Sequence, residues 1–300
     1  MKIKKLALVV LFLASNFALR AQDYAFKVLV NKGKNEVKAG NDWQPIKTGT
    51  SLKSSDEVKL VDNAYLGLIH ATGKPLEVKQ AGKYKVVDLA ARISGGTSVL
   101  NKYTDFILSS NAQKKDRLTA TGAVHRGAQN IEVYLPDTKS VVVYIYSNKI
   151  TFGWDKSKGA GPYVVLFKSM FGDELDKIEA PENYASVDLG GANFVNEDNI
   201  IVQVYPKKDP NKLSDDYTLR KLSKADKERI MTSLGEIAPQ TNEENALNKL
   251  ILAGFFEQNN LLIDAGSAYL EAIKLAPDVV AYQDGYEEFL LRNNLKKPTK

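Results

Sequence analysis

The sequence predicts a multi-domain α+β protein with an N-terminal small β domain and short helices, a central β-sandwich and a C-terminal α-helical hairpin. Three observations carry this prediction. Short alternating apolar runs between Gly, Asn, Asp and Pro clusters fill residues 28–78, and a second series fills residues 131–219. From Leu247 onward, apolar residues recur at helical spacing instead. A chain of 300 residues is long enough for two or three such domains.

The first 21 residues have the plan of a secretory signal peptide. Met1–Lys5 is positively charged, Leu6–Leu13 is continuously apolar, and the small residue Ala21 precedes Gln22. The apolar core is too short to span a bilayer comfortably. We therefore expect cleavage after Ala21 and a periplasmic or extracellular mature protein without an integral membrane segment. The chain has no cysteine, which excludes a lipobox, disulfides and thiolate metal sites.

The charge of the chain is basic only because of this leader. Four of the 41 Lys and Arg residues lie in the first 21 positions, which leaves 37 basic against 36 acidic side chains. A nearly neutral mature chain offers no electrostatic footprint for nucleic acid and no polybasic patch for a membrane surface.

Residues 22–110 are predicted to form the first β domain. They contain a spaced pattern of aromatic, Pro, Gly and Asp residues, Trp43-x-Pro45-Ile46-x-x-Gly49-x-x-Leu52-x-x-x-Asp56-x-Val58, followed by Ala64-x-Leu66 and Gly73. Over about residues 28–88 this pattern resembles the extracytoplasmic domain of the FecR family. Ser55 departs from it, because the family usually has Gly before Asp56, although Ser-Asp also suits a turn. The resemblance implies a periplasmic sensing or interaction module rather than an enzyme.

Two short helices are expected at the end of this domain. One apolar face spans Val87 to Ile93 and another spans residues 97–108, with Gly95-Gly96 between them and Thr97 as a possible cap. We expect both helices to cover one side of the β domain. The polar stretch 111–130, which contains His125, is predicted to be a linker.

Residues 131–222 are predicted to form the β-sandwich. Expected strands lie at 131–135, 141–146, 150–154, 163–167, 175–179, 184–188, 200–205 and 217–219. Phe152-x-Trp154, a Gly-rich turn and Tyr163-x-Val165 resemble a fibronectin type III-like or immunoglobulin-like domain over about residues 131–220. The resemblance implies that Trp154 is a core tryptophan.

Residues 223–300 are predicted to be helical. Ser223 is expected to cap a helix from Lys224 to about Leu234, and Thr241-x-x-Glu244 reads as a capping box for the next helix. Small, apolar and proline positions match one tetratricopeptide repeat over about residues 246–279: Leu252, Ala253, Phe256, Ala265, Tyr269, Ala272 and Pro277. A single repeat cannot bury its own faces, so we expect residues 279–291 to cap it and the sandwich to cover another face. A packing or docking role is favoured over a peptide groove.

No segment of the sequence has a pattern that indicates a catalytic, cofactor-binding or metal-binding residue. The two histidines, His70 and His125, have no partner ligand at metal spacing, and the acidic residues Asp209, Asp215 and Asp216 lack the regular spacing of a calcium loop. The Gly pairs at 95–96 and 159–161 lack the Lys-Ser/Thr of a phosphate loop. A hydrolase built on dispersed carboxylates stays as a third possibility.

The preferred hypothesis is an exported, non-enzymatic envelope protein that acts through protein–protein interaction, as a scaffold or a sensor, with envelope proteins as partners. The alternative is an extracellular glycan-binding protein that uses Trp43, Trp154 or a tyrosine as a stacking platform. A lone Trp in a strand-rich pattern is more often a packing residue, so the first hypothesis is preferred.

Overall fold

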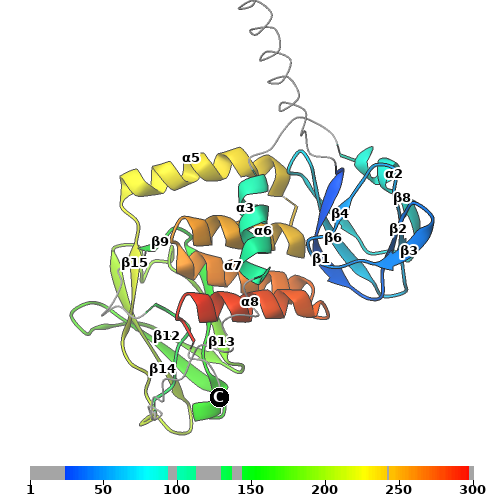
Figure 1. Ribbon diagram of the computed structural model, residues 1–300. Coiled ribbons are helices and arrows are strands. Elements are labelled where there is room, and N and C mark those ends of the chain that lie inside the picture. Colours follow the sequence, from blue (N-terminus) through cyan, green and yellow to red (C-terminus); the bar gives the residue numbers. More distant parts are fainter. Residues whose placement is uncertain (1–23, 94–99, 113–129, 137–143, 242, 297–300) are drawn as a thin grey trace, which may run out of the picture. The chain divides into compact units, whose positions relative to one another are not determined.

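The computed structural model describes residues 24–93, 100–112, 130–136, 144–241 and 243–296, in two compact units, Met1–Thr97 and Ser98–Lys300 (Figure 1). The predicted leader 1–21, most of the predicted linker 111–130, His125 and Thr97 lie outside the described residues. The chain is α+β: antiparallel sheets fill its N-terminal and central parts, and several helices form its C-terminal stretch.

The first unit consists of two four-stranded antiparallel sheets, ordered β4-β1-β6-β7 and β3-β2-β5-β8. The strands are β1 Phe26–Lys32, β2 Glu36–Ala39, β3 Asp42–Pro45, β4 Ser51–Leu52, β5 Glu57–Leu60, β6 Tyr65–His70, β7 Pro75–Val78 and β8 Gly82–Lys85. One apolar cluster takes residues from both sheets, among them Val28 and Leu68 from the first and Val37 and Val58 from the second. The two sheets therefore face each other across a shared core, closed by the short helix α2 Val86–Ala90.

A buried polar hub joins the turns of this unit. The Asn35 side chain, 1% exposed, donates to Asn31 Oδ1 (2.8 Å) and to the Lys32 carbonyl (2.9 Å), and its Oδ1 accepts from the Val61 N–H (3.2 Å). The turn at Ser55-Asp56 forms as expected, because Asp56 Oδ2 accepts from the Lys53 N–H at 2.7 Å. Side chains thus satisfy backbone groups that the strands leave unpaired where they end.

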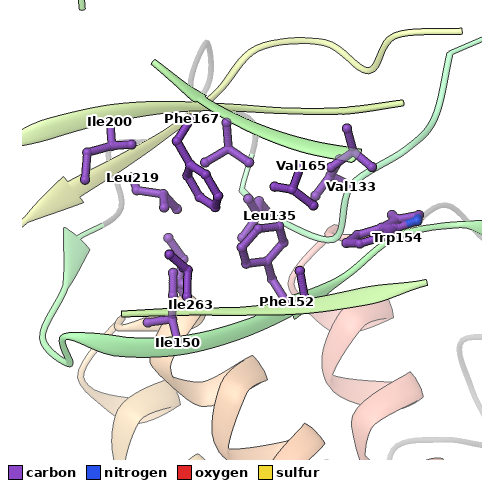
Figure 2. Packing of buried hydrophobic residues seen from close by; sticks show 14 of the residues in the cluster. Val133, Leu135, Ile150, Phe152, Trp154, Val165, Phe167, Ile200, Leu219 and Ile263 are labelled. Atoms are coloured by element: carbon purple, nitrogen blue, oxygen red, sulfur yellow. The ribbon is translucent and has the colours of Figure 1, made fainter. Parts of the chain in front are cut away.

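The second unit contains a five-stranded sheet, ordered β12-β11-β14-β15-β9, and a two-stranded sheet, β10-β13. The strands are β9 Tyr144–Ile145, β10 Lys149–Gly153, β11 Tyr163–Lys168, β12 Glu174–Ala180, β13 Tyr184–Asp188, β14 Asn199–Pro206 and β15 Tyr217–Lys221, with the short helix η1 Lys156–Lys158 after β10. All pairings are antiparallel except β15 with β9. The two sheets enclose a core that includes Phe152, Trp154, Val165 and Phe167 (Figure 2).

The strand expected at 131–135 is wrong as a full strand. The segment makes only an isolated bridge between Val133 and Trp154, although Ile131, Val133 and Leu135 are all buried. Their alternation reflects burial in the sandwich core rather than a long hydrogen-bonded ladder, and a period of two does not distinguish these cases.

The C-terminal helices are α5 Lys224–Thr241, α6 Ala246–Gln258, α7 Leu262–Leu275 and α8 Val280–Arg292. Ser223 caps α5 as expected, since its Oγ accepts from the Asp226 N–H at 3.2 Å. The predicted end near Leu234 and the predicted capping box at Thr241 are wrong. Thr241 is the last residue of α5 and donates to the Ile237 carbonyl (3.2 Å), whereas Asn245 caps α6 by accepting from the Asn248 N–H at 2.8 Å. Asn caps a helix at least as well as Thr, and it lies directly before Ala246.

The helix α3 Asn101–Ala112, which was expected in the first β domain, belongs to the second unit and packs there on α6. Tyr103 meets Phe255 edge-to-face at 5.3 Å between ring centroids, and Gln258 Nε2 donates to the Lys102 carbonyl at 3.2 Å. A Cβ at Gly254 would lie 2.9 Å from the Ile107 side chain, so the glycine permits this close packing. The helix α3 therefore covers an apolar face of α6 that would be exposed to solvent in a solitary helical hairpin.

The sandwich and the helices share one unit rather than meeting at a boundary near residue 222. Ile263 of α7 reaches the sandwich core (Figure 2). Asp264, 2% exposed, accepts from the backbone N–H groups of Tyr146 (2.9 Å) and Ser147 (2.8 Å), and Ser267 Oγ accepts from the Thr151 N–H at 2.9 Å. The helix α7 therefore supplies acceptors for N–H groups of β10 and of the segment that leads into it.

Candidate functional site

The two tryptophans have opposite environments. Trp154 is fully buried in the sandwich core and meets Tyr163 edge-to-face at 5.2 Å between ring centroids (Figure 2). The expectation of a core tryptophan is confirmed, and this residue offers no face for stacking on a sugar. Trp43 lies on β3 and is only partly buried, on the outer face of its sheet. Of the two tryptophans, only Trp43 is accessible.

Trp43 lies close to two cationic side chains. The Nζ atoms of Lys59 on β5 and Lys83 on β8 are 5.8 and 5.7 Å from the centroid of its ring. Lys59 also pairs with Glu36 on β2, with 3.2 Å between Nζ and Oε2. The face therefore combines one aromatic ring with ammonium and carboxylate groups, which are groups that bind polar and anionic ligands.

His70 is part of the packing of the first unit. Its ring meets Phe26 edge-to-face at 5.1 Å, and its Nδ1 accepts from the Thr72 N–H at 3.2 Å. Burial lowers the pKa of His70 below 6.5, and the positive charge of Lys74 lowers it further. These contacts give the histidine a structural role.

The acidic residues considered as a calcium site point to separate partners. Asp216 Oδ1 accepts from Gln203 Nε2 at 2.6 Å, and Asp209 lies 3.6 Å from the Lys212 ammonium. Within the residues that the structure describes, no three His, Cys, Asp or Glu side chains are placed to hold a metal ion. In the same residues, no helix is both long and apolar enough to cross a bilayer.

The hairpin between β11 and β12 is a surface feature that the sequence reasoning missed. At its tip, residues 169–173, Met170 is 52% exposed and Phe171 is 95% exposed. Between two predicted strands, the sequence Ser-Met-Phe-Gly-Asp places two large apolar residues in a turn, where small and polar residues are usual, and this was the available signal.

The hairpin tip is held by a network of hydrogen bonds. The Ser169 Oγ accepts from the N–H groups of Phe171 (3.1 Å) and Asp173 (3.2 Å), and the Ser169 N–H donates to the Asp173 carbonyl at 2.8 Å. Gly172 takes a φ of +93°, which favours glycine, and its N–H donates to the Ser169 carbonyl at 3.1 Å. The turn thus presents Met170 and Phe171 to solvent from an ordered backbone.

A third exposed apolar residue lies at the same end of the sandwich. Lys168 pairs with Ile201 near the start of β14, so the loop that precedes β14 borders the hairpin tip. Phe194 of that loop packs edge-to-face on Phe167 at 5.4 Å, and the adjacent Val195 is 60% exposed. We call Met170, Phe171 and Val195 the apolar end.

Acidic residues follow both segments of the apolar end in the sequence: Asp173 and Glu174 come directly after Gly172, and Glu197 and Asp198 come shortly after Val195. The two neighbouring lysines make internal contacts, since Lys168 Nζ donates to Gln203 Oε1 (2.7 Å) and Lys221 Nζ donates to the Phe194 carbonyl (2.6 Å). Lys221 also lies close enough to Asp198 and Glu197 for their charges to interact, so charges of both signs border the apolar end.

No family model matches this chain, and no curated protein sequence matches it.

Proposed function

We propose that this is an exported, non-enzymatic envelope protein that acts through protein–protein interaction, as a scaffold or a sensor. The observation that carries the proposal is the apolar end, and above all Phe171, which is 95% exposed on a hydrogen-bonded turn. Single exposed apolar side chains are common on monomeric proteins, whereas a group of them at one end of a domain marks an interaction site.

The energetics favour binding through this turn. Burying a phenylalanine side chain contributes about 1.5–3 kcal/mol, and aromatic residues are frequent among the side chains that dominate interface energies. The turn is already ordered by Ser169 and Gly172, so little conformational entropy is lost when a partner closes over it.

The resemblances in the sequence agree with this proposal. FecR-like, fibronectin-like and tetratricopeptide-like segments are interaction modules in the families they resemble, and the leader directs the chain to the envelope. N-terminal sequencing of the exported protein tests the leader: we expect a chain that starts at Gln22, and a chain that still starts at Met1 contradicts export by cleavage.

Site-specific photo-crosslinking in intact cells tests the interaction. A photoreactive phenylalanine analogue placed at 171 is expected to yield a discrete adduct with an envelope protein. The matched control is position 184, because Tyr184 is also exposed (50%) but lies at the opposite end of the sandwich, next to the strand end at Ala180. The proposal fails if position 171 gives no adduct or the same adducts as position 184.

Glycan binding is the second candidate function. Trp154 cannot bind a sugar because it is buried in the core. Trp43 is accessible beside Lys59 and Lys83, and this is the observation that favours glycan binding.

A further inference from the structure

The outer face of the sheet β3-β2-β5-β8 collects charged side chains around Trp43. Along β2 and β5, Val37 and Val58 are buried while their neighbours point outward, as strand alternation requires. The outward residues include Trp43, Lys38, Lys59, Lys83, Glu36 and Glu57. This is an open surface with one aromatic ring and both signs of charge.

The three central side chains converge although their strands are not neighbours. The strand β2 separates Trp43 on β3 from Lys59 on β5, and Lys83 on β8 is one strand farther away. Adjacent strands are about 4.8 Å apart, so the backbones of Trp43 and Lys83 are roughly 14 Å apart across the sheet. Both ammonium nitrogens nevertheless lie within 6 Å of the ring centroid, at 5.8 and 5.7 Å. The long side chains therefore lean across the face and meet above β2 and β5.

We infer that this face, the Trp43 face, binds an acidic polysaccharide. The indole ring stacks on the C–H face of a sugar ring, and Lys59 and Lys83 bind the carboxylate of a uronic acid unit beside it. Glu36 and Glu57 supply acceptors for sugar hydroxyl groups, which donate hydrogen bonds as well as accept them. The ion pair between Lys59 and Glu36 is exposed, with side chains 45% and 36% accessible, so a ligand exchanges it at little cost.

The mixed charge selects among anionic ligands. A nucleic acid or a polyglutamate segment carries closely spaced negative charges and would be repelled by Glu36 and Glu57. A uronic acid polymer carries hydroxyl groups beside each of its charges, and the two carboxylates accept hydrogen bonds from these hydroxyl groups. The aromatic ring also favours a sugar, because a rigid sugar ring stacks on the indole better than a flexible acidic peptide does.

Calorimetric titration of the full-length mature protein with oligogalacturonate tests the inference, with neutral dextran oligomers and polyglutamate as comparison probes. We expect binding of oligogalacturonate alone, weakened by salt because part of it is ionic. Trp43→Ala is expected to abolish it, and Lys59→Gln with Lys83→Gln is expected to weaken it about tenfold. The matched control is Lys177→Gln with Lys208→Gln, two exposed lysines of the sandwich, which makes the same change in net charge without an effect.

Tryptophan fluorescence gives an independent reading. Because Trp154 is fully buried in the second unit, a ligand-dependent change in emission is expected to come from Trp43, and Trp43→Phe is expected to remove it while circular dichroism stays unchanged. Equal binding of polyglutamate, no binding of oligogalacturonate, or equal losses in the control pair would each overturn the inference. None of these outcomes affects the protein-binding role proposed for the apolar end, which lies in the other unit.

Discussion

The ion pair between Glu257 and Arg292 is predicted to be the most sensitive polar contact of the helical region. Arg292 Nε and Nη2 each donate to the Glu257 carboxylate at 2.6 Å, and Asn293 Nδ2 donates to Glu257 Oε1 at 2.7 Å. Arg292 Nη2 also reaches the Tyr269 hydroxyl at 3.1 Å. The two charged side chains are only 8% and 5% exposed, so water does not replace a lost partner. The pair joins the C-terminal ends of α6 and α8 across α7.

Glu257→Leu removes one partner and leaves the guanidinium buried without its counter-ion. Breaking a buried pair in this way costs about 3–5 kcal/mol. For a unit of roughly 200 residues, each kcal/mol lowers the melting temperature by about 2–4 °C, so we expect a decrease of roughly 6–20 °C. The double variant Glu257→Leu with Arg292→Met removes both charges and is expected to recover most of this loss, because a buried ion pair contributes little beyond its apolar replacement.

Urea unfolding followed by tryptophan emission measures the changes in the free energy of unfolding, and thermal unfolding followed by the same emission measures the changes in melting temperature. A Trp43→Phe background leaves Trp154 as the single fluorophore, so the signal reports the second unit alone. Lys207→Gln serves as the control, since it breaks an exposed pair with Glu179 and is expected to cost less than about 0.5 kcal/mol. A loss below about 1 kcal/mol for Glu257→Leu, or a double variant no more stable than the single one, refutes the reasoning.

Three further predictions concern the other polar contacts. Asn35→Ala removes the buried hub of the first unit and is expected to cost about 2–4 kcal/mol in urea unfolding, because it leaves the Lys32 carbonyl and the Val61 N–H without this partner; a loss under about 1 kcal/mol would show that water replaces the side chain. Asp264→Ala leaves two partly buried N–H groups unpaired and is expected to cost about 2–4 kcal/mol, more than Ser267→Ala, which leaves one; the reverse order contradicts this account of the contact between α7 and the sandwich. Since the pKa of His70 is lowered, the folded first unit binds fewer protons than the unfolded chain just below pH 6.5, so acidification through that range is expected to destabilise it. His70→Gln is expected to make the urea midpoint depend less on pH in this range. If the midpoint changes with pH as much as in the unsubstituted protein, His70 is not the group responsible.

Alternation and turn residues predicted most of the strands. The segments expected at 163–167 and 184–188 form β11 and β13 within one residue of their predicted limits. Helical periodicity likewise predicted that the chain from Leu247 onward is helical, and α6, α7 and α8 lie there. These features depend on interactions a few residues apart, which a sequence displays directly.

Contacts between residues far apart in the sequence decided which helix and sheet surfaces pack together. The apolar face of α3 predicted burial, but nothing local to residues 101–112 indicated α6 as its partner, about 150 residues later. Trp43 and Trp154 both lie in strand-like patterns, yet only the packing of whole sheets buries one ring and leaves the other beside Lys59 and Lys83. The amino-acid sequence by itself determined which side chains share a face and where each segment turns. Only the tertiary structure decided what covers each face, because burial is a property of the neighbours that the chain brings from far away.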